Sequence, residues 1–165
     1  MKKPDRQEMP PVGLVAHDHA ACVASALAQA ETRCAQEGLR MTPVRRRTLE
    51  ILLESHVAMG AYDVLARLAA EGLGDKPPVA YRALSFLVEH GFAHRIEKLN
   101  AFVACSHPGE SHEAVFLICR KCHKVGEANL AQPISGEIGH DGFRVERMVI
   151  EAEGLCPDCQ RLEAA

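Results

Sequence analysis

Two Cys-x-x-Cys pairs are the residues of this chain most clearly arranged for chemistry. The first pair is Cys119 and Cys122, and the second is Cys156 and Cys159 near the C-terminus. A two-residue spacer lets one tight turn aim both sulfurs of a pair at the same ion, and four thiolates in a tetrahedron form a structural zinc site. The sequence therefore predicts one structural zinc ion, held by these four cysteines, that pins a small folded unit lying between the pairs.

Two disulfides, or four unrelated buried cysteines, are the alternative interpretation of these residues. A lone Cys-x-x-Cys would also be compatible with a redox motif. Two copies of the pair in one chain favour the metal site.

A second set of candidate ligands is mixed in type: His94, Cys105, His112 and Glu127. Two nitrogens, one sulfur and one oxygen can bind zinc tetrahedrally. Taken singly, His94 and His112 could be surface residues, Cys105 a core residue of a strand and Glu127 a solvated acid. If the four act together, they couple the orientation of two domains to metal binding.

The elements that must position these residues follow from the spacing of apolar side chains. Helices are expected over 20–37, from Pro43 after a Thr42 cap, over 61–71 and from Pro77. Two short strands over 92–97 and 101–105 come next. Three helices followed by a hairpin are typical of a winged helix. The inward face of the helix at Pro43 is expected to contain Val44, Thr48, Ile51, Leu52 and Ser55.

The helix that begins at Pro77 has the features of a recognition helix. Tyr81, Arg82, Ser85 and Glu89 are expected to face outward, and a helix with exposed Tyr and Arg in its first turns fits entry into the major groove. The guanidinium of Arg82 could reach O6 and N7 of a guanine. Three arginines in the first turn of the preceding helix indicate a phosphate partner or, alternatively, a solvated basic face: Arg45, Arg46 and Arg47.

The C-terminal part of the chain has a different pattern. Residues 105–112 read as a hinge, and strands are expected over 114–118, 124–127 and 143–152, with a weak helix over 130–141. The predicted fold class is α+β, with a flexible tail over 1–19, a winged-helix DNA-binding domain over 20–104, the hinge over 105–112 and a small α/β zinc-binding domain over 113–165.

Composition and charge limit the functional class. The net charge of −3 by itself argues against a nucleic-acid binder. Residues 40–98, however, contain nine Lys or Arg against seven Asp or Glu, whereas residues 99–165 contain six against ten. No apolar run is long enough to span a membrane, and the start lacks the apolar segment of a secretory signal. Seven cysteines then favour a reducing compartment, so a cytoplasmic location is expected.

A group of motifs in order along residues 20–160 resembles the ferric uptake regulator family. The motifs are Thr42-Pro43-x-Arg45, Ala61-Tyr62-Asp63, Lys76-Pro77-Pro78-x-x-Tyr81-Arg82-Ala83-Leu84, Gly91-Phe92-x-His94 and the two Cys-x-x-Cys pairs. The Lys-Pro-Pro run and the closing run Val149-Ile150-Glu151-Ala152-x-Gly154-Leu155-Cys156 are most similar to its zinc-sensing members.

The resemblance implies a function and a set of roles. His94, Cys105, His112 and Glu127 match the ligands of a regulatory zinc ion, so that two zinc ions per chain are expected. Tyr62 and Arg82 match residues that read bases, and Tyr81, Arg45 and Arg46 are further candidates for DNA contact. The resemblance also implies a homodimer formed through residues 113–165, which binds double-stranded operator DNA and represses metal-uptake genes.

Sensing of iron, manganese or peroxide is the alternative within the family. Iron sensors usually carry a His-His-x-His run before the first Cys-x-x-Cys, and Ser111-His112-Glu113-Ala114 stands there instead. A thiolate at Cys105 suits zinc better than iron(II) or manganese.

Two other classes compete with a regulator. A zinc enzyme needs an open metal position and a general base, but four ligands would close the second site, and the sequence contains no His-Glu-x-x-His motif. A pure interaction module held by structural zinc would leave the exposed Tyr81-Arg82 pair and the hinge residues without a purpose. No enzymatic activity and no small-molecule substrate other than a metal ion are therefore expected.

Overall fold

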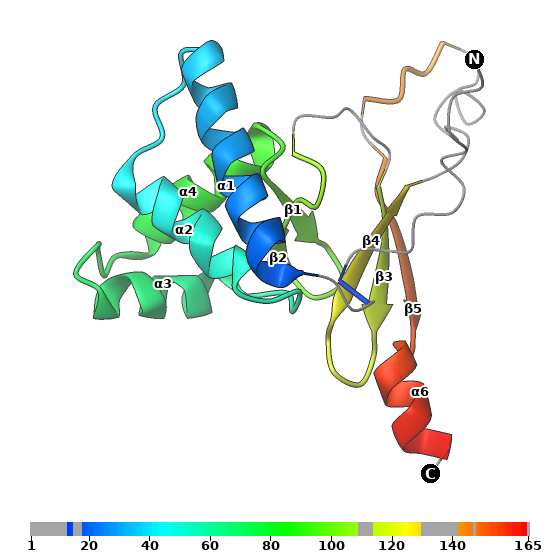
Figure 1. Ribbon diagram of the computed structural model, residues 1–165. Coiled ribbons are helices and arrows are strands. Elements are labelled where there is room, and N and C mark those ends of the chain that lie inside the picture. The colour runs from blue at the N-terminus through cyan, green and yellow to red at the C-terminus, as the bar shows by residue number, and fades with distance from the viewer. Residues whose placement is uncertain (1–12, 15–17, 109–113, 130–141, 147, 165) are drawn as a thin grey trace.

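A computed structural model describes residues 13–14, 18–108, 114–129, 142–146 and 148–164 of the chain. These residues form a helical unit with a β-hairpin, followed by a three-stranded sheet and a C-terminal helix (Figure 1). This is the predicted α+β class. Among them, no helix is both long enough and apolar enough to cross a membrane.

The four helices of the first unit begin where the local signals predict. Their bounds are α1 His19–Gln36, α2 Pro43–Leu53, α3 Ala61–Ala70 and α4 Pro77–Glu89. The Thr42 side chain accepts a hydrogen bond from the backbone N–H of Arg45 at 3.3 Å, which caps α2. Proline at the first position of α2 and of α4 has its φ already suited to a helix and no N–H to satisfy.

The apolar faces of α1 to α4 meet in one core. Leu49 and Ile51 of α2, Leu68 of α3, and Leu84 and Leu87 of α4 are all buried in it. Tyr81, Arg82, Ser85 and Glu89 of α4 face solvent, as the spacing predicts.

One inward position of α2 was predicted wrongly. Ser55 is exposed, because α2 ends at Leu53 and the chain then turns away from the core. Thr48, in contrast, is fully buried, and its hydroxyl donates to the carbonyl oxygen of Val44 at 2.8 Å. The buried hydroxyl is therefore satisfied within the helix.

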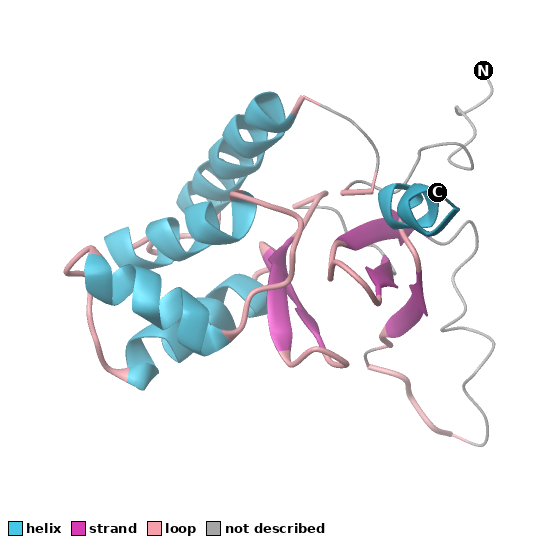
Figure 2. Ribbon diagram, turned by 90° about the horizontal axis from the view of Figure 1, so that it is seen from below, coloured by secondary structure: helices cyan, strands magenta, loops and turns pink. Residues whose placement is uncertain are grey.

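The β-hairpin lies between the helices and the three-stranded sheet (Figure 2). Its strands are β1 Ala93–Ile96 and β2 Ala101–Ala104, paired antiparallel. Asn100 adopts a left-handed φ of 46° in the turn between them, a conformation that Asn tolerates better than most residues. The hairpin carries His94 on β1 and ends immediately before Cys105.

The sheet of the second unit has the strand order β4-β3-β5. Its strands are β3 Ala114–Cys119, β4 Val125–Asn129 and β5 Ile150–Gly154; β3 runs antiparallel to β4 and parallel to β5. Helix α6, Pro157–Ala164, follows β5 and was not predicted.

The strand predicted over 143–152 is wrong in its first part. Pairing with β3 starts at Ile150, opposite Val115, and continues to Gly154. The described residues between 143 and 149 form no strand, although their side chains alternate in polarity. The helix predicted over 130–141 lies outside the described residues.

The two units share a second, smaller core. Ile96 and Val103 of the hairpin pack with Phe116, Ile118 and Val125 of the sheet. The backbone N–H of Val125 also donates to the carbonyl oxygen of His56 at 2.9 Å. This junction places the hairpin against one face of the sheet.

Candidate metal centres and nucleic-acid interface

The four cysteines of the two Cys-x-x-Cys pairs come together at one end of the sheet. Their sulfurs lie within 4.8 Å of one another; Cys119 ends β3, Cys122 lies in the following turn, and Cys156 and Cys159 lie at the start of α6. The sulfurs of Cys122 and Cys156 are 3.7 Å apart. Corners of a tetrahedron whose metal–sulfur distance is about 2.3 Å are separated by about 3.8 Å. The spacing therefore fits a zinc ion.

The disulfide alternative does not fit this geometry. All four thiols are free, and a disulfide needs its sulfurs about 2.05 Å apart. His123, which follows Cys122, is exposed and has a left-handed φ of 60°. It is not part of the four-sulfur group.

Two of these thiols, those of Cys119 and Cys159, have pKa values shifted in opposite directions. Burial raises the pKa of Cys119, but backbone N–H groups, that of Cys156 first among them, outweigh burial and lower its pKa to about 6. Burial, with the neighbouring sulfurs adding to it, raises the pKa of Cys159 to about 12. Four thiolates this close repel one another, so a divalent cation is required to ionise the whole set.

Three of the four mixed ligands meet where the hairpin contacts the sheet. Donor atoms of His94, Cys105 and Glu127 lie within 4.8 Å of one another. Nε2 of His94 is 3.3 Å from Oε1 of Glu127, and the Cys105 sulfur is 3.9 Å from the same oxygen. His112, the fourth predicted ligand, lies outside the described residues.

Glu127 is the buried acidic residue of this site. The residue is 5% exposed, and its Oε2 accepts a hydrogen bond from the backbone N–H of Ser106 at 2.8 Å. Burial lowers the pKa of His94, but hydrogen bonds to Cys105 and Glu127 outweigh it and raise its pKa to about 9. The site therefore stabilises positive charge, which a proton or a metal ion can supply.

Phe116 is a contributor that the sequence interpretation missed. The ring of His94 packs on the ring of Phe116 with 5.0 Å between centroids, and Phe116 pairs with Glu127 across β3 and β4. The regular alternation of β3 could have pointed to it, because residues paired across strands share a face of the sheet.

The predicted DNA-facing residues form an exposed group at the start of α4. Tyr81 is 46% exposed and Tyr62 of α3 is 67% exposed, with their rings edge to face at 6.4 Å between centroids. Arg82 is also exposed, and it lines a shallow groove together with Tyr81 and Arg45. Arg45 lies over the Phe86 ring at 3.7 Å and donates to the carbonyl oxygen of Arg40 at 2.6 Å.

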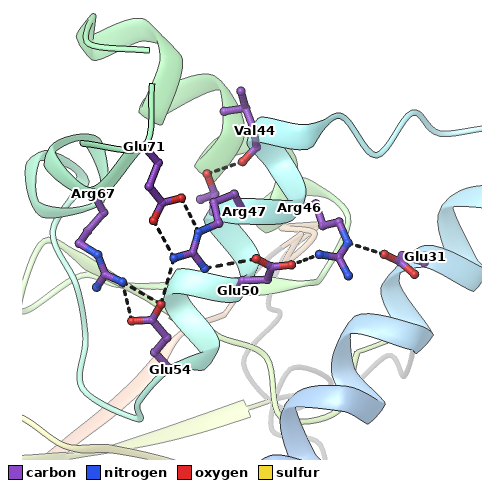
Figure 3. Close-up of polar contacts among 9 residues, drawn as sticks. Glu31, Val44, Arg46, Arg47, Glu50, Glu54, Arg67 and Glu71 are labelled. Atoms are coloured by element: carbon purple, nitrogen blue, oxygen red, sulfur yellow. Dashed lines mark hydrogen bonds and ion pairs between the residues drawn. The ribbon is translucent and has the colours of Figure 1, made fainter. Parts of the chain in front are cut away.

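The other two arginines of α2 bind glutamates of the same chain (Figure 3). Arg47 donates to Glu71, the residue that caps the end of α3, at 2.6 and 2.7 Å and also pairs with Glu50 and Glu54. Arg46 pairs with Glu31 of α1 at 2.7 Å and with Glu50. Of the three, Arg45 lines the groove with Tyr81 and Arg82, whereas the network of Arg46 and Arg47 ties α2 to α1 and to the residue after α3.

Comparison with known proteins decides the family. No protein-family model matches the chain. The zinc uptake regulation protein of Escherichia coli (strain K12) is 40% identical over 144 residues, which are 84% of this chain and 83% of that protein. The corresponding protein of Shigella flexneri gives the same values. The chain belongs to the zinc uptake regulator family.

Solved structures of zinc uptake regulators agree with this assignment. A zinc uptake regulator complexed with zinc and DNA matches with a TM-score of 0.78 at 36% identity, over 87% of this chain and 98% of that chain. Holo XcZur matches with a TM-score of 0.72 at 34% identity, over 83% of this chain and 98% of the other. These relatives are named as regulators, which confirms the expectation that this chain has no enzymatic activity.

The fold of the wider ferric uptake regulator family is shared as well. The ferric uptake regulator of Helicobacter pylori matches with a TM-score of 0.50 at 17% identity, over 92% of this chain. At that identity the likeness concerns the fold alone.

Proposed function

We propose that the chain is a zinc-responsive DNA-binding repressor of zinc-uptake genes, which binds operator DNA as a homodimer when regulatory zinc is bound. One observation carries the proposal: His94 lies on the hairpin of the winged helix and Cys105 directly follows it, whereas Glu127 comes from the sheet. A metal ion at this junction links the two units. Its presence therefore controls how the recognition helix α4 is held.

The states of a related regulator support a metal-linked arrangement. Holo XcZur matches this structure with a TM-score of 0.72, and apo XcZur matches with 0.50. The two matches have nearly the same identity, 34% and 35%. Sequence similarity does not explain the difference, so the present arrangement of the units resembles the holo form.

The proposal assigns two zinc ions to each chain. Cys119, Cys122, Cys156 and Cys159 hold the structural ion, and His94, Cys105 and Glu127, with His112, hold the regulatory one. The thiolate at Cys105 favours zinc over iron(II) and manganese. This ligand set is the reason for preferring a zinc sensor to the family's iron, manganese or peroxide sensors.

The remaining assignments follow the same division of the chain. Residues 20–104 bind DNA and residues 113–165 form the dimer, joined by the hinge over 105–112 and preceded by the tail over 1–19. A cytoplasmic location suits both the DNA partner and the free thiols. The residues proposed to contact DNA are Tyr62, Tyr81, Arg82, Arg45 and Arg46.

In this mechanism, each residue at the junction between hairpin and sheet has a separate role. Glu127 is held by the Ser106 N–H, so one carboxylate oxygen stays directed at His94. The ring of Phe116 packs against the imidazole of His94 and so limits its orientation. Zinc bound there supplies the cross-link between hairpin and sheet. Because zinc favours the DNA-competent arrangement, DNA must tighten zinc binding by the same factor.

Fluorescence anisotropy of a labelled zinc-uptake promoter tests the proposal. The full chain, with its structural zinc in place, is titrated with metal-buffered zinc, iron(II) or manganese. We expect binding with free zinc alone, and we expect Cys105→Ser to fold but to lose the zinc response. Wild-type-like binding by that variant would contradict the proposed site, and binding driven by iron or manganese would contradict zinc sensing.

A further inference from the structure

Glu151 belongs to the closing run Val149–Cys156, yet neither metal site nor the DNA-facing group uses it. It lies on β5 and is half-buried. Its carboxylate accepts two hydrogen bonds from consecutive backbone amides, that of Glu97 at 2.6 Å and that of Lys98 at 3.0 Å. Those amides form the start of the turn at the tip of the β1–β2 hairpin. The Glu151 side chain of the sheet is thus hydrogen-bonded to the backbone of the hairpin turn.

Glu151 and Glu127 stand in the same row of the sheet. Phe116 on β3 pairs with Glu127 on β4 and with Glu151 on β5. Side chains in one row across neighbouring strands point to the same face. Since His94 packs on Phe116, that face is turned to the hairpin. The two carboxylates therefore flank Phe116 and hold the hairpin at two separate places.

The contacts of Glu127 and of Glu151 with the hairpin differ in the groups that they involve. Glu127 holds the hairpin through His94 and Cys105, which are the proposed metal ligands. Glu151 holds it through backbone N–H groups alone. Hydrogen bonds from N–H groups to an ionised carboxylate are stronger than neutral ones, and they need no metal.

We propose that Glu151 is a positioning residue of the regulatory site, which docks the hairpin tip on the sheet so that His94 and Cys105 stay within reach of Glu127 before metal binds. Its regulatory meaning rests on the proposed function. The apparent affinity of a site falls with the fraction of molecules in the competent arrangement. By raising that fraction, Glu151 sets the zinc concentration at which the site fills.

A neighbouring ion pair provides a matched control. Glu153, also on β5, pairs with Nζ of Lys98 at 2.7 Å, and the two side chains are 40% and 47% exposed. Exposed pairs of this kind contribute little because water and salt screen them. Glu153→Gln removes a carboxylate that lies on the same strand and contacts the same turn, but it leaves both backbone hydrogen bonds of Glu151 in place.

The test measures zinc affinity in the full chain with its structural zinc retained and without DNA. Zinc is competed against a chromophoric chelator for wild type, Glu151→Ala, Glu151→Gln and Glu153→Gln, and hydrogen exchange follows the amides of Glu97 and Lys98. We expect Glu151→Ala to weaken regulatory zinc binding about tenfold, within the range typical of coupling between sites. Glu151→Gln, which keeps one acceptor oxygen, should lie between Glu151→Ala and wild type, and Glu153→Gln should stay within about twofold of wild type.

Unchanged zinc affinity in a folded Glu151→Ala chain whose two amides exchange faster would overturn the inference. If Glu151→Ala does not fold, Glu151→Gln decides in the same way. Because the readout contains no DNA, failure of the inference is distinct from failure of the proposed function. A wild-type chain that binds zinc but never binds DNA contradicts only the latter.

Discussion

At the residue scale, the two candidate metal centres have different relations to the fold. The four-cysteine site joins the end of β3 to the start of α6, two segments of one unit. The mixed site joins the hairpin to the sheet, and its ligands come from two units. Loss of a ligand from the first site should therefore affect folding, whereas loss of a ligand from the second should affect the arrangement of the units.

Cys119→Ser is expected to unfold the sheet unit, because structural zinc contributes folding free energy. Zinc content after gel filtration and the circular dichroism spectrum measure this effect. Cys22→Ser is the matched control, since Cys22 is half-buried on α1 and belongs to neither metal group. A Cys119→Ser chain that keeps the wild-type spectrum and elutes as a dimer would contradict the structural assignment.

Arg82→Ala is expected to weaken operator binding by about 1–3 kcal/mol and to relax specificity at one base pair. The reason is the exposed position of Arg82 beside Tyr81 at the start of α4. Binding titrations against a set of single-base operator variants measure both effects. An equal loss on every sequence would show a phosphate contact instead of base reading.

At the element scale, the arginines of α2 serve the packing of helices as well as the charge of the surface. Arg47 connects α2 to Glu71 at the end of α3, and Arg46 connects it to Glu31 on α1. The hydrogen bond from Arg47 lowers the pKa of Glu71. The pKa of the Glu71 carboxyl is therefore lower in the folded chain than in the unfolded chain. The ion pair with Arg47 contributes fully to stability above the ordinary carboxyl pKa, and this contribution is lost as pH falls through the lowered pKa.

Glu71→Gln should therefore lower the free energy of unfolding at pH 7, and the difference from wild type should shrink under acid conditions. Urea unfolding of both chains over a pH series measures this difference, from which effects of zinc release common to both chains cancel. Glu37→Gln, which removes a pair with Arg33 inside α1, is the control with an expected effect below about 0.5 kcal/mol. A difference independent of pH would contradict the role of the ion pair.

The elements that the sequence predicts best are those with local signals. The starts of α2 and α4 are given by Thr42, Pro43 and Pro77, because caps and proline act within one turn. The start of β5 could not be predicted in this way. Residues 143–149 alternate like a strand, but the partner strand β3 pairs only from Ile150 onward. The end of α2 at Leu53, which leaves Ser55 exposed, has no such signal either.

Candidate sites show the same limit. The repeated spacing of the cysteine pairs is enough to predict their metal site. A shared site for His94, Cys105 and Glu127 is predicted only with the help of the family resemblance. The pairs Arg46–Glu31 and Arg47–Glu71, and the hydrogen bonds of Glu151 to the hairpin, join residues far apart in sequence. Such contacts depend on tertiary packing, so no local pattern predicts them.

At the scale of the whole molecule, we propose that the junction between hairpin and sheet holds the winged helix in place. The junction contains the apolar contacts of Ile96, Val103 and Phe116, the candidate metal ligands, and the hydrogen bonds of Glu151. With apolar contacts and hydrogen bonds alone, we expect an equilibrium between docked and undocked units. Zinc at His94, Cys105 and Glu127 should shift it to the docked state.

Single-molecule energy transfer between dyes on α1 and α6 tests this claim most directly. Unnatural amino acids at the exposed positions Ala24 and Ala164 carry the dyes, and excess unlabelled chain ensures one labelled chain per dimer. We predict a broad distance distribution when only structural zinc is present, and one narrow population when regulatory zinc is added to wild type but not to Cys105→Ser. Identical distributions with and without regulatory zinc would contradict zinc-dependent docking of the winged helix on the sheet.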